Sequence, residues 1–248
     1  MKCWICGAPA STGEHKIKKS LLVALHGAGP YIDASALAHI KNGAASPLQG
    51  PGSKRVKYEN SLCADCNSSR TQSYDRAFDK FFAFVIHNED YVLKHRVIDF
   101  FDVYGESFPV DQLNLFKYFV KLLGCDLREH GYAVPGDLVS LLGQDIFQTG
   151  LKVSFAVNED SLLLSTPSER SAGIGELNTT LRNLDAKDEP KYRWHTYFSF
   201  LHVYYWYCWE PDGPFGAPWI ADSRYLYLGS YYPLSPEERM AFISSQAK

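Results

Sequence analysis

Residues 3–7 read CWICG and residues 59–70 read ENSLCADCNSSR, so the chain carries two Cys-x-x-Cys pairs. Each pair brings two thiolates to one side of a tight turn, and two pairs supply the four soft ligands that tetrahedral Zn²⁺ prefers. The alternative is a pair of redox-active thiol sites. The 56 residues between the pairs exceed what a compact zinc ribbon needs, which leaves open whether one shared site forms. We expect a structural zinc site made by Cys3, Cys6, Cys63 and Cys66.

Length and composition indicate an ordinary globular protein. The 248 residues can bury one large core or two modest ones. No stretch approaches the about 18 consecutive apolar residues of a membrane span, and the N-terminus lacks the apolar run of a signal peptide. We therefore expect a cytoplasmic protein without membrane contact. Thiols stay reduced there, which favours metal ligation by the paired cysteines and predicts buried thiols for Cys125 and Cys208.

The net charge of −3 is unevenly distributed along the chain. Residues 1–80 hold 11 Lys/Arg against 6 Asp/Glu, and the remaining residues hold 14 against 22. Phosphate is the natural counter-charge for basic clusters, although isolated surface lysines would look the same. Because the basic residues flank both cysteine pairs, we expect contacts with nucleic acid from Lys16, Lys18, Lys19, Lys54, Arg55 and Lys57.

Several helices are expected in the first 150 residues. Apolar residues recur every three or four positions over 73–87, which predicts a helix with one buried face. A second helix is expected over 111–123, capped by Asp111 and ended by Gly124. A short helix is expected over 138–142. The mixed pattern of 91–104 is compatible with helix, strand or both.

Strand signals dominate after residue 150. Residues 151–157 and 161–166, separated by Asn-Glu-Asp, predict a hairpin, and the polar stretch 167–190 predicts a surface excursion. Another strand is expected at 225–231, after a Pro- and Gly-rich loop over 211–218. The chain closes with Ser235-Pro236-Glu237-Glu238, a capping box that predicts a short terminal helix.

A dense aromatic run, 192–209, contains neither glycine nor proline. Its composition favours strand, and a buried helix of the same composition remains an alternative. Aromatic faces can stack on unpaired bases, but the stretch 194–209 has no Lys or Arg. We therefore expect a core or an oligomer interface here, with His195 and His202 as core or surface histidines rather than ligands.

The order CWICG, then GEH at 13–15, then ENSLCADCNSSR resembles the HNH nuclease family. The ββα-metal motif of that family is a hairpin and a helix that grip one divalent ion. Its zinc-stabilised branch has a Cys-x-x-Cys pair before an acidic-His pair, an Asn shortly before a second LCxxC, and His or Asn directly after it. This chain matches each element in order. The resemblance covers residues 1–80 and does not extend to the rest.

The resemblance over residues 1–80, together with the helix and strand signals of the remaining chain, predicts an α+β fold in two parts. Residues 1–88 would form a treble-clef-like ββα-metal module with its zinc site and an inserted loop at 26–52. Residues 89–248 would form a larger mixed α/β region that ends in antiparallel strands and serves target selection or oligomerisation.

The resemblance also implies the site chemistry. His15 would be the general base, since an imidazole accepts a proton near neutral pH. Glu14 and Asn67 would hold Mg²⁺ or Mn²⁺ through oxygen atoms. Asn60 would orient the His15 ring, although Glu59 beside it leaves open which residue faces the base. Arg70 would contact a phosphate.

This chain departs from the family pattern in four places. The acidic residue is Glu14 rather than the commoner Asp, and the residue after the second pair is Asn67 rather than His. Glu and Asn at these two places are variants that occur within the family. Lys18 stands where a proline often follows, and the interval from His15 to Asn60 is longer than usual.

The implied function is a metal-dependent endonuclease acting on nucleic acid, DNA in the first place. Family-level analogy adds restriction, phage defence or mobile elements as settings, with self-association or a defence partner protein. The sequence is also compatible with two alternatives. One is a zinc-stabilised nucleic-acid-binding or scaffolding protein without catalysis, and the other is a thiol oxidoreductase.

Overall fold

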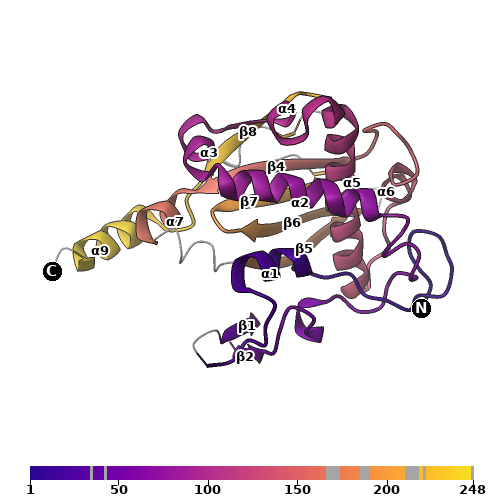
Figure 1. Cartoon of the computed structure of the whole chain (residues 1–248), viewed down its shortest axis with the longest axis horizontal. Helices are drawn as coiled ribbons and strands as arrows, with labels where there is room; N and C mark the ends of the chain where they lie inside the picture. The colour runs from indigo at the N-terminus through magenta and orange to yellow at the C-terminus, as the bar shows by residue number, and fades with distance from the viewer. Residues whose placement is uncertain are drawn as a thin grey trace. The chain divides into compact units, whose positions relative to one another are not determined.

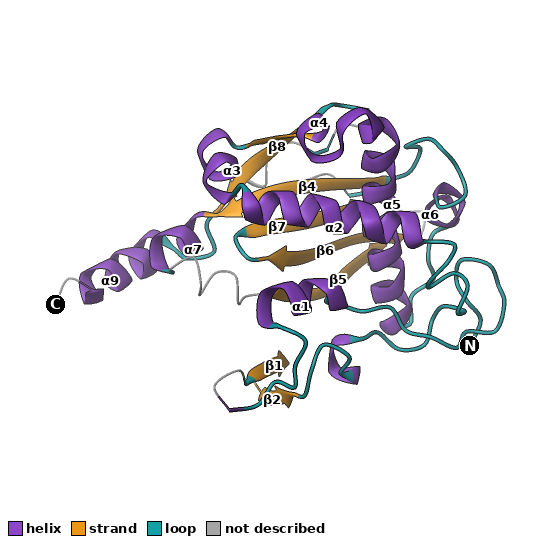
Figure 2. Cartoon of the chain, viewed as in Figure 1, coloured by secondary structure: helices purple, strands orange, loops and turns teal. Residues whose placement is uncertain are grey.

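The computed structural model describes residues 1–33, 36–41, 44–165, 174–184, 190–209, 218–219 and 222–246. Helices and strands both contribute, which confirms the α+β class (Figures 1 and 2). The chain forms two compact units. Unit 1 comprises residues 1–81 and 113–146, and unit 2 comprises residues 82–112 and 147–248. Within the described ranges, no helix is both long and apolar enough to cross a membrane.

This division differs from a single boundary after residue 88. Residues 113–146 group with the N-terminal segment, because the helix at 108–129 packs against it. The Tyr118 ring of that helix stacks on Phe78 with centroids 4.2 Å apart, and Phe119 meets Phe78 edge-on at 6.2 Å. Such a contact joins residues about 40 positions apart and has no local sequence signal.

Unit 1 is mainly helical. The helices expected at 73–87 and 138–142 are confirmed as α2 and α6. The elements are α1 (Lys19–His26), β1 (Leu37–Lys41), β2 (Ala44–Leu48), the 3₁₀ turn η2 (Lys54–Val56), α2 (Gln72–His87), α5 (Phe108–Glu129) and α6 (Gly136–Leu141), with α2 and α5 continuing into unit 2.

Helix α5 is longer than expected at both ends. The predicted stop at Gly124 is wrong, because the helix continues to Glu129. A Cβ at Gly124 would lie 2.5 Å from the Trp4 ring, so glycine is required there by close packing. Asp111 lies inside the helix rather than capping it, and its carboxylate accepts a hydrogen bond from the Ser107 hydroxyl at 2.7 Å.

The segment expected as an inserted loop, 26–52, contains an antiparallel hairpin made by β1 and β2. A small core of buried side chains anchors this segment to the chain on either side of it. Alanine, serine and proline are poor strand formers, so the hairpin was not visible in the sequence. The core consists of Leu22, Tyr31, Leu48 and Val56, with Ile17 and Leu37 packed against it.

Unit 2 is built on a six-stranded sheet in the order β3-β8-β4-β7-β6-β5, of which all strands but β3 are labelled in Figure 1. Neighbouring strands are antiparallel, except that β4 and β8 run parallel. Helices α3 and α4 with strand β3 occupy the stretch 91–104, whose mixed pattern is compatible with both helix and strand. The strands are β3 (Val97–Asp99), β4 (Leu151–Asn158), β5 (Ile174–Leu184), β6 (Pro190–Phe198), β7 (Leu201–Tyr207) and β8 (Tyr225–Tyr231); the helices are α3 (Glu89–His95), α4 (Phe100–Tyr104), the 3₁₀ turn η3 (Gly105–Ser107), α7 (Glu159–Leu164) and α9 (Pro236–Gln246).

The hairpin expected over 151–166 is wrong in its second half, where α7 follows β4 directly. The Asn158 side chain caps this helix by accepting a hydrogen bond from the Ser161 N–H at 3.0 Å, and two acidic residues occupy its first turn. The expected excursion at 167–190 lies partly outside the described residues. Its described residues are 174–184, which form strand β5 rather than loop, and Pro190, which begins β6.

The aromatic run 192–209 is strand as expected, but it forms two strands. Strands β6 and β7 pair as a hairpin with a two-residue turn at Ser199 and Phe200. Ser199 adopts a left-handed backbone with φ 56°, a conformation that the sequence did not signal because neither glycine nor asparagine is present. Cys208, expected to be buried, is exposed just after β7, whereas Cys125 is buried as expected.

The last two elements follow their sequence signals. Strand β8 covers the expected 225–231. The capping box at the start of α9 is reciprocal: the Ser235 N–H donates to the Glu238 carboxylate at 2.8 Å, and the Glu238 N–H donates to the Ser235 hydroxyl at 3.2 Å. The loop expected at 211–218 lies outside the described residues except for Pro218.

His195 and His202 are core residues of the sheet, with 5% and 2% of their surface exposed. The Asn158 oxygen is occupied by the helix cap, so the Asn158 amide donates to His202 Nε2 at 3.2 Å. His202 Nδ1 then carries the proton and donates to His195 Nε2 at 2.6 Å. Both rings are therefore neutral acceptors in the folded protein.

We expect this histidine pair to make unit 2 sensitive to mild acid. Burial, with the neighbouring His202, lowers the pKa of His195 to about 3, and burial lowers the pKa of His202 to about 4. In the unfolded chain both pKa values are about 6.5, so the unfolded state binds more protons below that pH. Stability therefore falls as the pH drops from about 6.5, by about 1.4 kcal/mol per pH unit for each histidine.

The measurement is the urea unfolding free energy of wild type and His195→Phe at neutral pH and at about pH 5.5. The variant should lose about 1.4 kcal/mol less than wild type on acidification. The comparison cancels His130, whose pKa is raised to about 9 by its bond to Asp126 and which acts with the opposite sign. Equal acid sensitivity of the two proteins would contradict the prediction.

Candidate metal centre and active site

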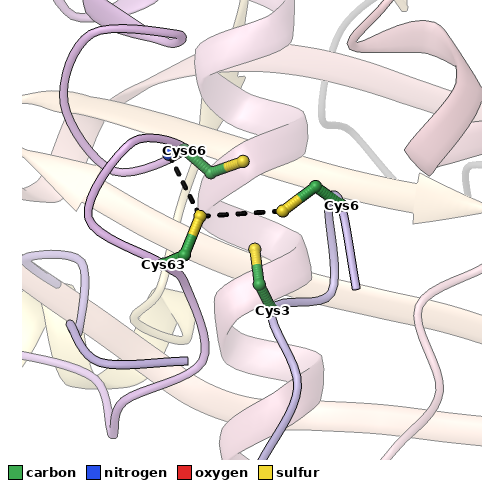
Figure 3. A group of neighbouring side chains, drawn as sticks. All are labelled: Cys3, Cys6, Cys63 and Cys66. Carbon is green, nitrogen blue, oxygen red and sulfur yellow. Dashed lines mark hydrogen bonds between the residues drawn. The ribbon is translucent and has the colours of Figure 1, made fainter. Parts of the chain in front are cut away.

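The four paired cysteines lie together in unit 1. Their sulfur atoms all fall within 4.8 Å of one another, and the Cys6 and Cys63 sulfurs are 3.6 Å apart (Figure 3). In a tetrahedral zinc site with metal–sulfur bonds of about 2.3 Å, the sulfurs are about 3.8 Å apart. The cluster therefore matches the dimensions of one metal ion such as zinc. The long insertion does not prevent one shared site.

Backbone hydrogen bonds shape the first cysteine turn and join it to the second. The Cys3 N–H donates to the Ala8 carbonyl at 2.7 Å, and the Gly7 N–H donates to the Cys3 carbonyl at 2.8 Å. The Trp4 N–H donates to the Ser61 carbonyl at 3.2 Å, just before the second pair. These backbone bonds hold the two cysteine turns next to each other without using the cysteine sulfur atoms.

The second cysteine turn leads into α2. The Asn67 N–H donates to the Cys63 carbonyl at 3.0 Å, and the Thr71 hydroxyl donates to the Cys66 carbonyl at 2.9 Å. The backbone N–H of Cys66 also points at the Cys63 sulfur, at 3.4 Å.

The thiols of Cys3 and Cys66 differ in their pKa values. Burial acts to raise the pKa of Cys3, but hydrogen bonds from the backbone of Cys63, Cys6 and Ile5 outweigh it and lower that pKa to about 7. Burial and the neighbouring thiols raise the pKa of Cys66. Four thiolates this close repel one another, so full ionisation of the cluster requires a cation among them.

The segment that follows the first cysteine pair, residues 12–15, forms an antiparallel ribbon with the segment that precedes the second pair, residues 57–62. The N–H groups of Thr12 and Leu62 donate to each other's carbonyls at 2.9 and 3.1 Å. The Tyr58 N–H donates to the Glu14 carbonyl at 2.9 Å, and His15 pairs with Lys57. A Cβ at Gly13 would lie 2.0 Å from the Tyr58 carbonyl oxygen, so this ribbon requires glycine there.

His15 and Asn67 both lie near this ribbon. The Asn67 amide donates to the Gly13 carbonyl at 3.4 Å, close to the Glu14-His15 pair. His15 Nε2 and Asn67 Oδ1 are among several buried side-chain atoms for which the described residues supply no hydrogen-bond partner. Buried polar atoms of this kind normally bind a protein group, a water or an ion. Burial and the charge of Lys57 lower the pKa of His15, and the opposing effect of the Glu14 carboxylate is smaller. The ring is therefore neutral at pH 7.

Glu14 is buried and already has partners for both carboxylate oxygens. Its Oε1 accepts the His15 N–H at 2.9 Å, and its Oε2 lies 2.6 Å from the ammonium of Lys121. Lys121 comes from α5, and its side chain is fully buried. The same ammonium lies 3.2 Å from Asp75 Oδ1 and 3.3 Å from the Thr71 hydroxyl.

This buried network was missed by sequence reasoning. Desolvation alone would lower the pKa of Lys121, but Glu14 and Asp75 outweigh it and raise that pKa. Burial, together with the nearby Glu14 carboxylate, raises the pKa of Asp75 against the opposing effect of the Lys121 and Lys18 ammonium groups. The available signal was a lysine between Val120 and Leu122 in an otherwise apolar stretch of helix.

Asn60 and Glu59 are exposed and are not brought to the His15 ring by any hydrogen bond among the described residues. Both belong to residues 59–61, which bulge between the paired Tyr58 and Leu62. The Glu59 N–H donates to the Glu129 carboxylate at 3.3 Å. The expected orienting role of Asn60 therefore has no supporting contact.

The basic residues divide into two groups. Lys16 pairs with Glu129, and Lys18 lies 2.9 Å from the Asp79 carboxylate, so these two are used within the protein. The guanidinium of exposed Arg70 lies 3.8 Å from the Cys66 sulfur. The remaining members of the expected phosphate-binding set face solvent to different degrees: Lys19, Lys54 and Arg55 are exposed and Lys57 is half-buried.

Comparison with protein-family models, with curated proteins and with solved structures finds no match to this chain. Its function is therefore inferred from the geometry of its own residues.

Proposed function

We propose that this protein is a metal-dependent endonuclease of the HNH type, which hydrolyses phosphodiester bonds in nucleic acid, DNA in the first place. The observation that carries the proposal is the pair of buried, unpartnered atoms His15 Nε2 and Asn67 Oδ1 beside one ribbon. His15 follows the first cysteine pair in the chain, and Asn67 follows the second. The four-cysteine cluster, which we assign to structural zinc, holds these two segments together.

The protein residues would contribute as follows. Phosphodiester hydrolysis needs a base for the attacking water and positive charge at the phosphate oxygens. Neutral His15 accepts the water proton at Nε2. Lys57, the ribbon partner of His15, and exposed Arg70 supply charge to the phosphate.

Of the two residues expected to bind a catalytic divalent ion, one has an available oxygen and the other is already engaged within the protein. Asn67 Oδ1 is an available oxygen ligand, and Glu14 is the second, in competition with Lys121. Mg²⁺ or Mn²⁺ bound there would polarise the phosphate and stabilise the leaving alkoxide. The unit that contains the sheet would then serve target selection, self-association or the binding of a defence partner.

A zinc-stabilised nucleic-acid-binding protein without catalysis is the second candidate. It is favoured by the engagement of both Glu14 oxygens and by the exposed position of Asn60. Under this alternative the ribbon and the cysteine cluster present the basic residues without any bond being cut. Binding to DNA would then be independent of His15.

The test is cleavage of supercoiled plasmid by zinc-loaded protein with Mg²⁺ or Mn²⁺. His15→Ala should lower the rate at least about 100-fold, because the general base is lost. Removal of the divalent ion should have a comparable effect. His87→Ala is the matched control, since His87 is exposed at the end of α2, and it should cut like wild type.

Equal cutting by wild type and His15→Ala would reject the assignment of His15 as the general base. If wild type binds DNA but cuts neither DNA nor RNA with any divalent ion, the second candidate replaces the first. Wild-type binding and binding by His15→Ala would then agree.

A further inference from the structure

We propose that the inserted hairpin and the basic turn after it form a pocket for the phosphate and sugar of one nucleotide. This inference rests on the proposed nuclease function, for which the pocket would hold the substrate strand next to the cutting site. The hairpin is the β1–β2 pair, and the basic turn is Lys54–Lys57, which contains η2.

The pocket has a volume of about 590 Å³ and lies within unit 1. This volume is in the range of sites that hold small molecules or parts of larger ligands. The sides come from the hairpin, from the basic turn, from the residue after His15 and from the end of α5. The lining residues are Lys16, His39, Ala44, Ser46, Lys54, Arg55, Lys57 and Glu129.

Strand register determines which hairpin side chains face the pocket. His39 lies directly opposite Ser46, and the Leu37–Leu48 pair two positions away packs into the small core. Successive side chains in a strand point to opposite faces, so these pairs share one face. Ala38, Ala45 and Pro47 on the other face are exposed. The insertion therefore presents a defined polar surface to the basic turn.

The charge of the pocket favours an anion. Lys54, Arg55 and Lys57 form no ion pair within the described parts of the chain, whereas Lys16 and Glu129 pair with each other. The planar guanidinium of Arg55 suits bidentate binding of a phosphate. The Ser46 hydroxyl offers a hydrogen bond to the sugar or the base edge.

The position of the pocket connects it with the proposed base. Lys57 is the ribbon partner of His15, and Lys16 follows His15 in the chain. The Lys16 N–H donates to the Val56 carbonyl at 2.8 Å, which fixes the two sides of the pocket relative to His15. A nucleotide held here adjoins the phosphate on which His15 would act.

The same chemistry is offered by a nucleotide within a strand and by a free nucleotide. The experiment measures binding of a short fluorescent DNA duplex by fluorescence anisotropy, in the His15→Ala protein so that no cutting occurs. A deoxynucleoside monophosphate is added as competitor. Competition only at millimolar concentration assigns the pocket to the strand, and competition near the DNA affinity assigns it to a free nucleotide.

The decisive variants are Ala44→Trp, which fills the pocket, and Ala45→Trp, which places the same ring on the exposed face of the same strand. Ala44→Trp should weaken binding about tenfold and Ala45→Trp should not, because only the first occupies the nucleotide volume. Because both variants place a large ring on the same strand, Ala45→Trp controls for any loss of hairpin folding.

A second pair of variants tests the charge. Lys54→Gln combined with Arg55→Gln should weaken binding about tenfold and reduce its salt dependence, since each phosphate contact releases counterions. Arg76→Gln combined with Lys94→Gln removes the same two residue types from exposed positions on α2 and α3, and should have little effect.

Unchanged binding in Ala44→Trp and in the Lys54/Arg55 variant overturns the pocket. The nuclease proposal then stands if wild type still cuts plasmid in a His15-dependent way. Weakened binding without any cutting by wild type keeps the pocket and rejects the nuclease. No binding of DNA or of the monophosphate by any protein overturns the pocket as well.

Discussion

Replacing Cys66 by serine is expected to abolish metal binding and to unfold most of unit 1. Cys66 is buried in the cluster, and a hydroxyl is a much weaker zinc ligand than a thiolate. Structural zinc contributes about 10–16 kcal/mol to small zinc domains, and a whole domain is stable by only about 5–15 kcal/mol. Loss of one of the four ligands therefore removes more stability than unit 1 can lose.

The measurement combines metal content with thermal unfolding followed by circular dichroism. Wild type should contain one zinc per chain and should lose its transition when a chelator is added. Cys208→Ser is the matched control, because Cys208 is exposed and lies in unit 2. It should keep both the zinc and the melting temperature. A Cys66→Ser protein with wild-type zinc content and melting temperature would contradict the metal centre.

The same samples test the thiol oxidoreductase alternative. With zinc bound, the paired thiolates are committed to the metal, and burial raises the pKa of the remaining core thiol, Cys125, to about 12. Only exposed Cys208 should then react quickly with a thiol reagent. Rapid reaction of several thiols in the zinc-loaded protein would favour the redox reading.

Local signals in the sequence predicted the parts of the fold that depend on neighbouring residues. The three-and-four spacing of apolar residues located α2, because a helix with one buried face must repeat in that way. The reciprocal bonds of Ser235 and Glu238 follow from a capping box within four residues. The two cysteine pairs likewise predicted the cluster, since each turn positions its own two sulfurs.

Features that depend on distant partners were missed. Gly124 looks like a helix stop, and only contact with Trp4 explains a glycine inside α5. Ser199 turns the chain between β6 and β7 because the buried Phe200 and the flanking strands determine its backbone. The pairing of Glu14 with Lys121 joins positions about 100 residues apart, so the buried partner of the expected metal ligand had no local signature.

Lys121→Met is expected to destabilise unit 1 by about 3–5 kcal/mol, because it leaves the buried Glu14 carboxylate without its ammonium, whereas half-buried Asp75 keeps Lys18 at 3.8 Å. Lys121 lies 2.6 Å from Glu14 Oε2 and 3.2 Å from Asp75 Oδ1, and its side chain is fully buried. Lys117→Met is the matched control one helical turn away. Lys117 is also buried, but its charge partner, Asp145, lies 3.8 Å away and is fully exposed. That substitution should cost less than about 1 kcal/mol, since the partner returns to water.

Urea unfolding of the two variants measures the difference, and Glu14→Gln in the Lys121→Met background separates its cause. If the uncompensated charge of Glu14 is responsible, the neutral amide should restore about 1–3 kcal/mol, whereas in wild type it should destabilise. Equal effects of Lys121→Met and Lys117→Met would instead mean that burial of a lysine stem, and not the charge network, stabilises the helix. If Glu14→Gln stabilises the Lys121→Met protein but destabilises wild type, Lys121 neutralises Glu14 in the resting protein. A divalent ion that uses Glu14 must then compete with an internal ammonium, which predicts tighter Mn²⁺ binding wherever Lys121→Met remains folded.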